Sequence, residues 1–286
     1  MFRFHPDRLQ IKDKLGNGRF GSVYPYQKDP QDLKWVVKRI RAGDIDALLA
    51  SLPEIVLGFA CHHPNVVPVK SYFIEKSADQ GCFNIYIKLP RMKTDLLHDL
   101  KDRKMKNKLY SEEEIIRHFY SLVCGIEYLH SKKIFHGDIK PDNLLLDETG
   151  HLKVADVGIA KHFEDEDLYQ TLTGSIGTYQ YSAPEILGES RKNVTKAALG
   201  KADVWSVGVV ILELCVSESR YLNGALPPEK LQYKIDESIG SLDGKYHKSL
   251  IALIKKALSI DPGERISIQE IKEGLENSFF QILVSS

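Results

Sequence analysis

The sequence around position 140 reads His136-Gly137-Asp138-Ile139-Lys140-Pro141-Asp142-Asn143. Thirteen residues beyond it comes Asp156-Val157-Gly158. Asp138, Asp156 and Asn143 together offer two carboxylates and one amide oxygen. Hard oxygen ligands in small number are what one or two Mg²⁺ ions bound to phosphates require. The two segments therefore predict a site for metal-bound phosphate.

Upstream of this stretch lies a glycine cluster, Gly16-Asn17-Gly18-Arg19-Phe20-Gly21-Ser22-Val23, which has the form GxGxxGxV. Glycine lets a backbone turn close over phosphates without a Cβ clash. Dinucleotide-binding folds use the same spacing, but they begin a helix directly after the glycines. Here Val23-Tyr24-Pro25-Tyr26 follows and is typical of a strand. We therefore expect a β-hairpin, and a plain hairpin turn is the alternative for this motif by itself.

A lysine, Lys38, follows Val36-Val37 in an apolar segment 17 residues after Gly21. Burying an ammonium group is costly unless it meets a counter-charge. Polyphosphate and a carboxylate would supply that charge. Glu54, nine residues before His63-Pro64-Asn65, is the best candidate for the carboxylate.

Composition excludes several classes of function. The chain has 286 residues and is 43% hydrophobic, with 39 basic and 39 acidic residues. A net charge of zero argues against a bulk role in binding nucleic acid or membranes, although it leaves room for a local basic patch. Four scattered cysteines without a CxxC pair are typical of reduced thiols. The start shows no signal peptide and the apolar run 207–216 is too short to span a bilayer. We expect a cytoplasmic protein, and a nuclear location is left open as the alternative.

The periodicity predicts an α+β fold. Residues 35–40 are rich in β-formers, and Ile85, Ile87 and Leu89 alternate with polar neighbours. Ser111 and Glu114 form a capping box before a long amphipathic helix, and residues 251–258 suggest another helix. We expect two unequal lobes: a small β-rich N-lobe over 1–89, a hinge at 90–93 and a larger helical C-lobe over 94–286.

Two more segments complete the pattern, Ala183-Pro184-Glu185 and Asp203-Val204-Trp205-Ser206-Val207-Gly208. With them, the sequence resembles a eukaryotic-type protein kinase over about residues 9 to 270. Lys140 and Gly177-Thr178 resemble the serine/threonine branch. The resemblance implies a bilobal enzyme that transfers the γ-phosphate of ATP, with Mg²⁺, to serine or threonine of a protein substrate, in intracellular signalling. It predicts no oligomeric state.

The resemblance also implies residue roles. Asp138 orients the substrate hydroxyl and accepts its proton, Lys140 steadies the γ-phosphate, and Lys38 holds the α- and β-phosphates and pairs with Glu54. Asn143 and Asp156 bind Mg²⁺, Leu89 is the gatekeeper, and Arg265 forms a structural pair with Glu185. The residues that contact ATP are Gly16, Asn17, Gly18, Gly21, Val23, Lys38, Glu54, Leu89, Pro90, Met92 and Asp95.

Several positions depart from the family pattern. Gly137 replaces an arginine that binds a phosphorylated activation loop, so we expect phosphorylation at Thr171, Thr173 or Ser175 to raise activity only modestly. Val157 replaces a phenylalanine, and Gly58 stands where a large apolar residue packs against it. We expect a neighbour such as Phe59 to fill that space, and a helix to begin at Pro53.

Two other classes of protein remain as alternatives. A pseudokinase would keep the fold without catalysis, although Lys38, Asp138, Asn143 and Asp156 are all present. Aminoglycoside-type phosphotransferases often share His136-Gly137-Asp138, but they generally lack the position of Lys140 and the two downstream segments. A P-loop enzyme is excluded because the chain has no GxxxxGK[ST] motif.

Overall fold

A computed structural model describes residues 14–18, 21–26, 34–77, 81–157, 161–162, 180–187, 196–216, 222 and 224–284. Contacts within these residues form two compact units. The first unit contains the described residues up to Lys93, together with Asp156 and Val157. The second contains Thr94–Ala155 and the described residues from position 161 onward. The first is β-rich and the second mainly helical, which confirms the predicted α+β class.

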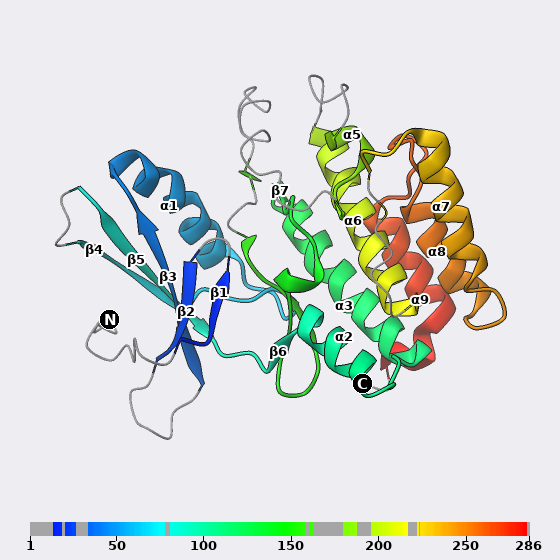
Figure 1. The fold of residues 1–286 in the computed structure, drawn as a ribbon, viewed down its shortest axis with the longest axis horizontal. Helices are drawn as coiled ribbons and strands as arrows, with labels where there is room; N and C mark the ends of the chain where they lie inside the picture. Colours follow the sequence, from blue (N-terminus) through cyan, green and yellow to red (C-terminus); the bar gives the residue numbers. More distant parts are fainter. Residues whose placement is uncertain are drawn as a thin grey trace. The chain divides into compact units, whose positions relative to one another are not determined.

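The first unit is built on a five-stranded antiparallel sheet of order β1-β2-β3-β5-β4 (Figure 1). Strands β3 and β5 pair along their whole length, from Trp35 opposite Pro90 to Ala42 opposite Phe83. Both strands cover segments that the sequence predicts as strands. The strands are β1 (Gly16–Gly18), β2 (Gly21–Pro25), β3 (Trp35–Ala42), β4 (Ser71–Lys76) and β5 (Phe83–Pro90).

Helix α1 (Ile45–Ala60) packs on this sheet and corrects a prediction. The helix begins eight residues before Pro53, because the carboxylate of Asp44 accepts a hydrogen bond of 2.7 Å from the backbone N–H of Ala47. A side-chain acceptor at this position satisfies a helix donor that otherwise lacks a partner. Leu48 and Ile55 then anchor the helix in the core formed with β3 and β5. The prediction that the helix begins at Pro53 was therefore wrong.

The space beside Gly58, within α1, is filled by Val69. A Cβ built on Gly58 would lie 2.6 Å from the Cγ2 atom of Val69. Phe59, the next residue in the chain, is 48% exposed. Val69, eleven positions along the chain, is therefore a neighbour that fills this space, and the same role for Phe59 stays a prediction.

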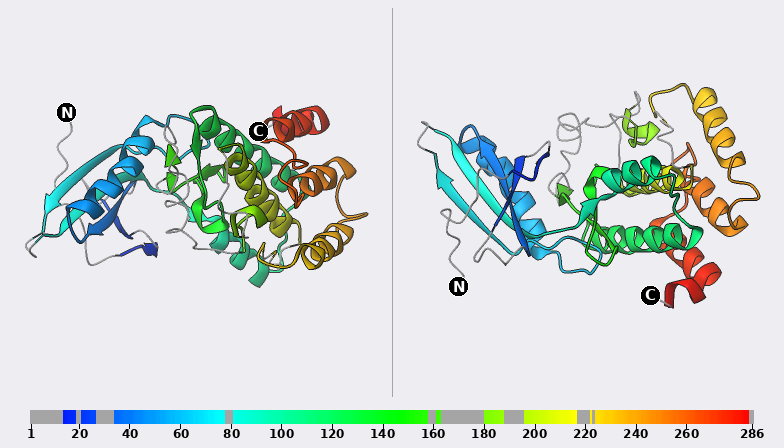
Figure 2. Two further views of the ribbon diagram at one scale, coloured as in Figure 1. Left: turned by 90° about the horizontal axis from the view of Figure 1, so that it is seen from above. Right: turned by 60° about the horizontal axis from the view of Figure 1, so that its bottom comes forward.

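The second unit is organised around helix α6 (Lys196–Val216), whose residues 203–215 are all buried. Helix α3 (Glu112–Ser131) packs against α6 and α9 (Figures 1 and 2). Its capping box is confirmed, since Ser111 and Glu114 exchange hydrogen bonds. The remaining helices are α2 (Leu96–Met105), α5 (Pro184–Leu187), α7 (Pro228–Gly240), α8 (Lys248–Ala257) and α9 (Ile268–Val284).

Short strands and one 3₁₀ turn shape the loops of the second unit. Strand β7 (Ile134–Phe135) pairs with β10 (Lys161–His162), and β6 (Thr94–Asp95), β8 (Leu144–Leu146) and β9 (Leu152–Val154) form a small sheet. The 3₁₀ turn η2 (Pro141–Asn143) lies between β7 and β8. None of the helices within the described ranges is long and apolar enough to cross a membrane.

Candidate active site

In the second unit, three predicted site residues form a buried cluster on the loop between β7 and β8. The Asp138 side chain is 7% exposed, and its Oδ2 lies 2.8 Å from the Nζ atom of Lys140. The Nδ2 atom of Asn143 donates to the same Oδ2 at 2.9 Å and to the backbone oxygen of Asp138 at 2.8 Å. Because its two amide hydrogens are directed at Asp138, the amide oxygen of Asn143 is the end that can accept a cation.

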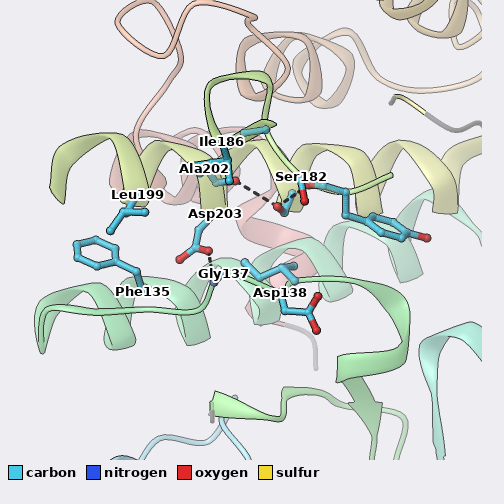
Figure 3. Close-up of a pocket in the computed structure, with 12 residues that line it drawn as sticks. Phe135, Gly137, Asp138, Ser182, Ile186, Leu199, Ala202 and Asp203 are labelled. Carbon is cyan, nitrogen blue, oxygen red and sulfur yellow. Dashed lines mark hydrogen bonds between the residues drawn. The ribbon is translucent and has the colours of Figure 1, made fainter. Parts of the chain in front are cut away.

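Asp203 on α6 holds the loop around Asp138 in place through hydrogen bonds (Figure 3). This carboxylate accepts hydrogen bonds from the backbone N–H groups of His136 and Gly137, both at 2.9 Å, and from the Nε2 atom of His130 at 2.8 Å. Burial opposes its ionisation, but the bonds from His130 and Gly137 outweigh burial and lower the pKa of Asp203. Asp203 therefore stays charged and keeps the loop in place.

The ring of His136 adds a second support to the same loop. It is fully buried, its Nδ1 accepts from the backbone N–H of Asp138 at 3.2 Å, and its Nε2 lies 2.9 Å from the backbone oxygen of Ala155. Since Nδ1 accepts, Nε2 carries the hydrogen and donates to Ala155. The supporting roles of His130, His136 and Asp203 were missed in the sequence, although the segments that contain His136 and Asp203 were both singled out.

A buried pair, Glu185 with Arg265, confirms another prediction. The guanidinium donates to both carboxylate oxygens, at 2.6 and 3.0 Å, and also to the backbone oxygen of Ser259 at 2.9 Å. The Arg265 side chain is fully buried and lies over the ring of Trp205. A bidentate pair with further hydrogen bonds compensates the cost of burying the charge, so its role is structural.

In the first unit, Lys38 on β3 lies beside Asp156. The Nζ atom and Oδ1 are 2.5 Å apart, with Lys38 6% and Asp156 29% exposed in their side chains. Asp156 has φ +58°, a left-handed conformation that costs a non-glycine residue about 1 kcal/mol. Such strain is common at functional sites. The predicted pairing of Lys38 with Glu54 stays a prediction, because the Glu54 side chain lies outside the described part.

The glycine cluster forms the expected hairpin. Strands β1 and β2 pair with Gly16 opposite Val23, Asn17 opposite Ser22 and Gly18 opposite Gly21. Gly21 has φ +145°, and a Cβ there would collide with the backbone oxygen of Arg39 on the next strand. A side chain at position 21 would therefore push β2 away from β3. Arg19 and Phe20 lie outside the described residues.

The residues predicted to face adenine and ribose are distributed over both units. Leu89 and Pro90 end β5, where they pair with Val36 and Trp35, and Met92 follows, partly buried. Asp95 belongs to the second unit, where it caps α2 by accepting from the backbone N–H of His98 at 2.8 Å. The His98 ring also contacts this carboxylate, at 2.7 Å from Nδ1. Gly177, Thr178 and the loop residues Thr171, Thr173 and Ser175 lie outside the described residues.

Comparison with known proteins gives the family. The protein kinase domain family matches residues 9–280, so the chain belongs to that family. It is 31% identical over 274 residues to "CBL-interacting protein kinase 26" of Oryza sativa subsp. japonica, covering 93% of this chain and 51% of the relative. It is 28% identical over 284 residues to "Probable serine/threonine-protein kinase nek1" of Dictyostelium discoideum, covering 93% of this chain and 56% of the relative.

A human relative, "Serine/threonine-protein kinase Nek11", is 29% identical over 272 residues, covering 92% of this chain and 39% of the relative. The chain therefore spans about half the length, or less, of these curated relatives.

Proposed function

We propose that this chain is the catalytic domain of a protein kinase that transfers the γ-phosphate of ATP to serine and threonine of other proteins. The observation that carries the proposal is the cluster of Asp138, Lys140 and Asn143, in a chain that belongs to the protein kinase domain family. The serine/threonine names of its relatives support the acceptor class. Cytoplasmic signalling is part of the same proposal.

The chemistry at Asp138 follows from its surroundings. The acceptor hydroxyl oxygen attacks the γ-phosphorus, the bond to the β,γ-bridging oxygen breaks, and ADP leaves. The hydroxyl proton passes to the Asp138 carboxylate, whose position is held by Asn143 and by the loop contacts of Asp203. Lys140, 2.8 Å from that carboxylate, places a positive charge beside the transferred phosphoryl group.

Each of the two proposed metal ligands suits Mg²⁺ by its own chemistry. Asp156 supplies a partly exposed carboxylate, and the orientation of Asn143 leaves its amide oxygen as an acceptor; oxygen ligands of this kind suit this ion. Bound Mg²⁺ supplies charge neutralisation on the phosphates. Lys38 binds the α- and β-phosphates, and the glycine hairpin covers them. The lobe assignment, 1–89 and 94–286 joined by a hinge at 90–93, belongs to this proposal.

Gly137 bears on regulation. It carries no charge beside Asp138, so a phosphate in the loop that follows Asp156 gains no bidentate arginine partner at this position. We propose that loop phosphorylation raises activity only modestly.

The test uses the purified chain with labelled ATP, Mg²⁺ and a mixed peptide library, read by mass spectrometry. We expect phosphoserine and phosphothreonine as the products. Asp138→Asn should lower kcat about a thousandfold, because a proton acceptor of this kind contributes on the order of 10²- to 10⁴-fold. Asp142→Asn, an exposed aspartate of the same loop, is the matched control. Equal turnover by Asp138→Asn and wild type, or no turnover by wild type, would reject the proposal.

A further inference from the structure

A basic surface lies at the end of helix α2, within the second unit (Figure 1). Lys101, Lys104 and Lys108 are exposed there. Lys101 and Lys104 share one face of the helix, because residues three positions apart are neighbours on a helix surface. Lys108 follows in the turn by which the chain leaves the helix. We call these three lysines, together with Met105 and Leu109, the α2 basic turn.

Two exposed apolar side chains lie among these lysines in the chain. Met105 is 77% exposed, the highest fraction among the large hydrophobic residues that the structure describes, and Leu109 is 62% exposed. Single exposed hydrophobic residues are common on protein surfaces and need no explanation. A pair of them within a basic segment is more specific, because one partner can then bury the apolar side chains and also compensate the positive charge.

Backbone hydrogen bonds hold this turn in one conformation. The N–H of Lys108 donates to the oxygen of Arg103 at 2.9 Å, and the N–H of Asn107 donates to the oxygen of Lys104 at 3.2 Å. Asn107 has φ +51°, the left-handed conformation that often ends a helix. The guanidinium of Arg103 lies 3.9 Å from the ring centre of Tyr110, which is buried. The exposed side chains therefore stand on an ordered backbone, so that binding costs little further ordering.

The three lysines have no acidic partner within the described ranges. Every carboxylate between positions 99 and 114 already has another partner: Asp99 and Glu114 pair with Arg103, Asp102 with Lys106, Glu113 with Arg117, and Glu112 accepts from the backbone N–H of His247. The positive charge of the α2 basic turn is therefore local and uncompensated there, although the chain as a whole is neutral. A negatively charged partner would compensate it.

The chemistry of the α2 basic turn favours a lipid surface over other anionic partners. Peptides are usually recognised in grooves, and no residue of the turn lines the pocket of the second unit. Single-stranded nucleic acid is bound by aromatic side chains on which bases stack, whereas Met105 and Leu109 are not aromatic. A bilayer with anionic lipids presents negative headgroups directly above an apolar region, so that lysines and aliphatic side chains of one turn can contact both.

We propose that the α2 basic turn binds the surface of a bilayer that contains anionic lipids. Lys101, Lys104 and Lys108 contact the headgroups, and Met105 and Leu109 enter the boundary between the headgroups and the acyl chains. Contacts of this kind are reversible and far weaker than the insertion of a membrane-spanning helix. The inference goes beyond the proposed function and does not rest on it, so that it applies equally to an active and an inactive chain.

The first experiment sediments the purified chain with lipid vesicles. We expect binding to vesicles of phosphatidylcholine with about 30% phosphatidylserine, and at least about tenfold weaker binding to vesicles of phosphatidylcholine alone. Raising NaCl from about 0.1 M to about 0.5 M should weaken binding, because salt shortens the range of the attraction from about 10 Å to about 4 Å. Equal binding to both kinds of vesicle, or no binding to the anionic kind, would overturn the inference.

A triple substitution, Lys101→Gln with Lys104→Gln and Lys108→Gln, removes the charge and keeps residues with good helix propensity. The matched control places glutamine at three other exposed lysines of the second unit, Lys230, Lys234 and Lys245. Both variants lose the same net charge, so that a difference between them depends on position. We expect about a hundredfold weaker binding to anionic vesicles for the first variant, since each lysine near such a surface contributes about fivefold. Equal losses in the two variants would contradict the proposal.

Met105→Ser with Leu109→Ser tests the apolar contact. The matched control is Tyr233→Ser with Phe280→Ser, because these residues are 71% and 60% exposed elsewhere in the second unit. We expect about tenfold weaker binding to anionic vesicles for the first pair and no change for the control. The tryptophan introduced by Met105→Trp should also be quenched by lipids brominated in their acyl chains, beyond any quenching in the wild type. Without this extra quenching, the side chain does not enter the bilayer and the inference is wrong.

An acidic protein is the alternative partner, and a polyglutamate peptide measured by fluorescence anisotropy is its probe. Peptide binding that the triple lysine variant abolishes, without binding of wild type to anionic vesicles, would show a docking site for acidic protein and reject the inference. Vesicle binding that is weakened both by the triple lysine variant and by the double serine variant, but not by their controls, supports it.

Discussion

In the second unit, the loop that carries Asp138 is held by the side chain of Asp203, which is 3% exposed, whereas in the first unit Lys38 meets the side chain of Asp156, which is 29% exposed. Asp203 holds its loop through backbone N–H groups, which have no rotamers to change. Lys38 and Asp156 meet through flexible side chains that solvent and ligands can separate. Contacts of the first kind place the proton acceptor in advance, and contacts of the second kind can exchange for phosphate and metal.

Among the substitutions that test this contrast, we expect Asp203→Asn to have the largest effect on the free energy of unfolding. An amide can accept at only one atom, so at least one of the buried donors that now face Asp203 loses its acceptor. Breaking a buried charged contact costs about 3 kcal/mol, and we expect that loss in the free energy of unfolding in urea. The control Asp243→Asn, an exposed aspartate, should change it by less than about 0.5 kcal/mol. Equal effects of the two substitutions would show that Asp203 does not hold the loop.

The next test uses His118, a buried histidine on α3 of the second unit. Burial lowers its pKa from 6.5 to about 4. The unfolded chain therefore takes up a proton at higher pH than the folded chain does. The contribution of His118 to the free energy of unfolding is fully present above pH 6.5. It falls as the pH drops toward 4, by up to about 3 kcal/mol.

The measurement for His118 is the free energy of unfolding between pH 7 and pH 4, compared with His118→Gln. The glutamine variant has no ring to protonate, so its stability should change less over this range. The carboxylates titrate in both proteins, so their contributions to the free energy of unfolding cancel when the two curves are subtracted. Parallel curves for the two proteins would mean that the buried ring does not contribute to acid sensitivity.

A smaller effect is expected from Gly58→Ala in the first unit. The added methyl group would lie 2.6 Å from Val69, and overpacking of this kind costs about 1–3 kcal/mol. The better helix propensity of alanine returns about 1 kcal/mol, which leaves a net loss of about 1 kcal/mol. Adding Val69→Ala removes the clash, so the double variant should lose less than the two single losses combined. Simple additivity in denaturant unfolding would contradict the packing.

The smallest effect on stability is expected from Lys38→Met. Methionine keeps the apolar stem in its buried place, and the remaining carboxylate of Asp156 is open enough to be hydrated. The unfolding free energy should therefore change by less than about 1 kcal/mol. In contrast, kcat/KM for ATP should fall about a hundredfold, equal to about 2.7 kcal/mol. A large loss in the free energy of unfolding would instead show that Lys38 has a structural role, as Asp203 does in the second unit.

Local signals in the sequence were sufficient for the strands at β3 and β5, for the capping box of α3 and for the grouping of Asp138 with Lys140 and Asn143. These local signals failed where residues far apart in the sequence determine the structure. The start of α1 was misplaced because Pro53 is a common first-turn residue, while the cap at Asp44 was not considered. The support of Asp138 by Asp203 joins residues more than sixty positions apart, and no periodicity reports such a contact.

The pair of Glu185 and Arg265 has a consequence for how the chain folds. Its two residues are 80 positions apart, and closing a flexible loop of that length costs about 4 kcal/mol of chain entropy. That cost falls once α6 and α8, which lie between them in the chain, have packed together. We therefore expect the segment at α5 to dock late in folding and to detach early in unfolding. A nascent chain still on the ribosome would hold Glu185 without its partner until Arg265 had emerged.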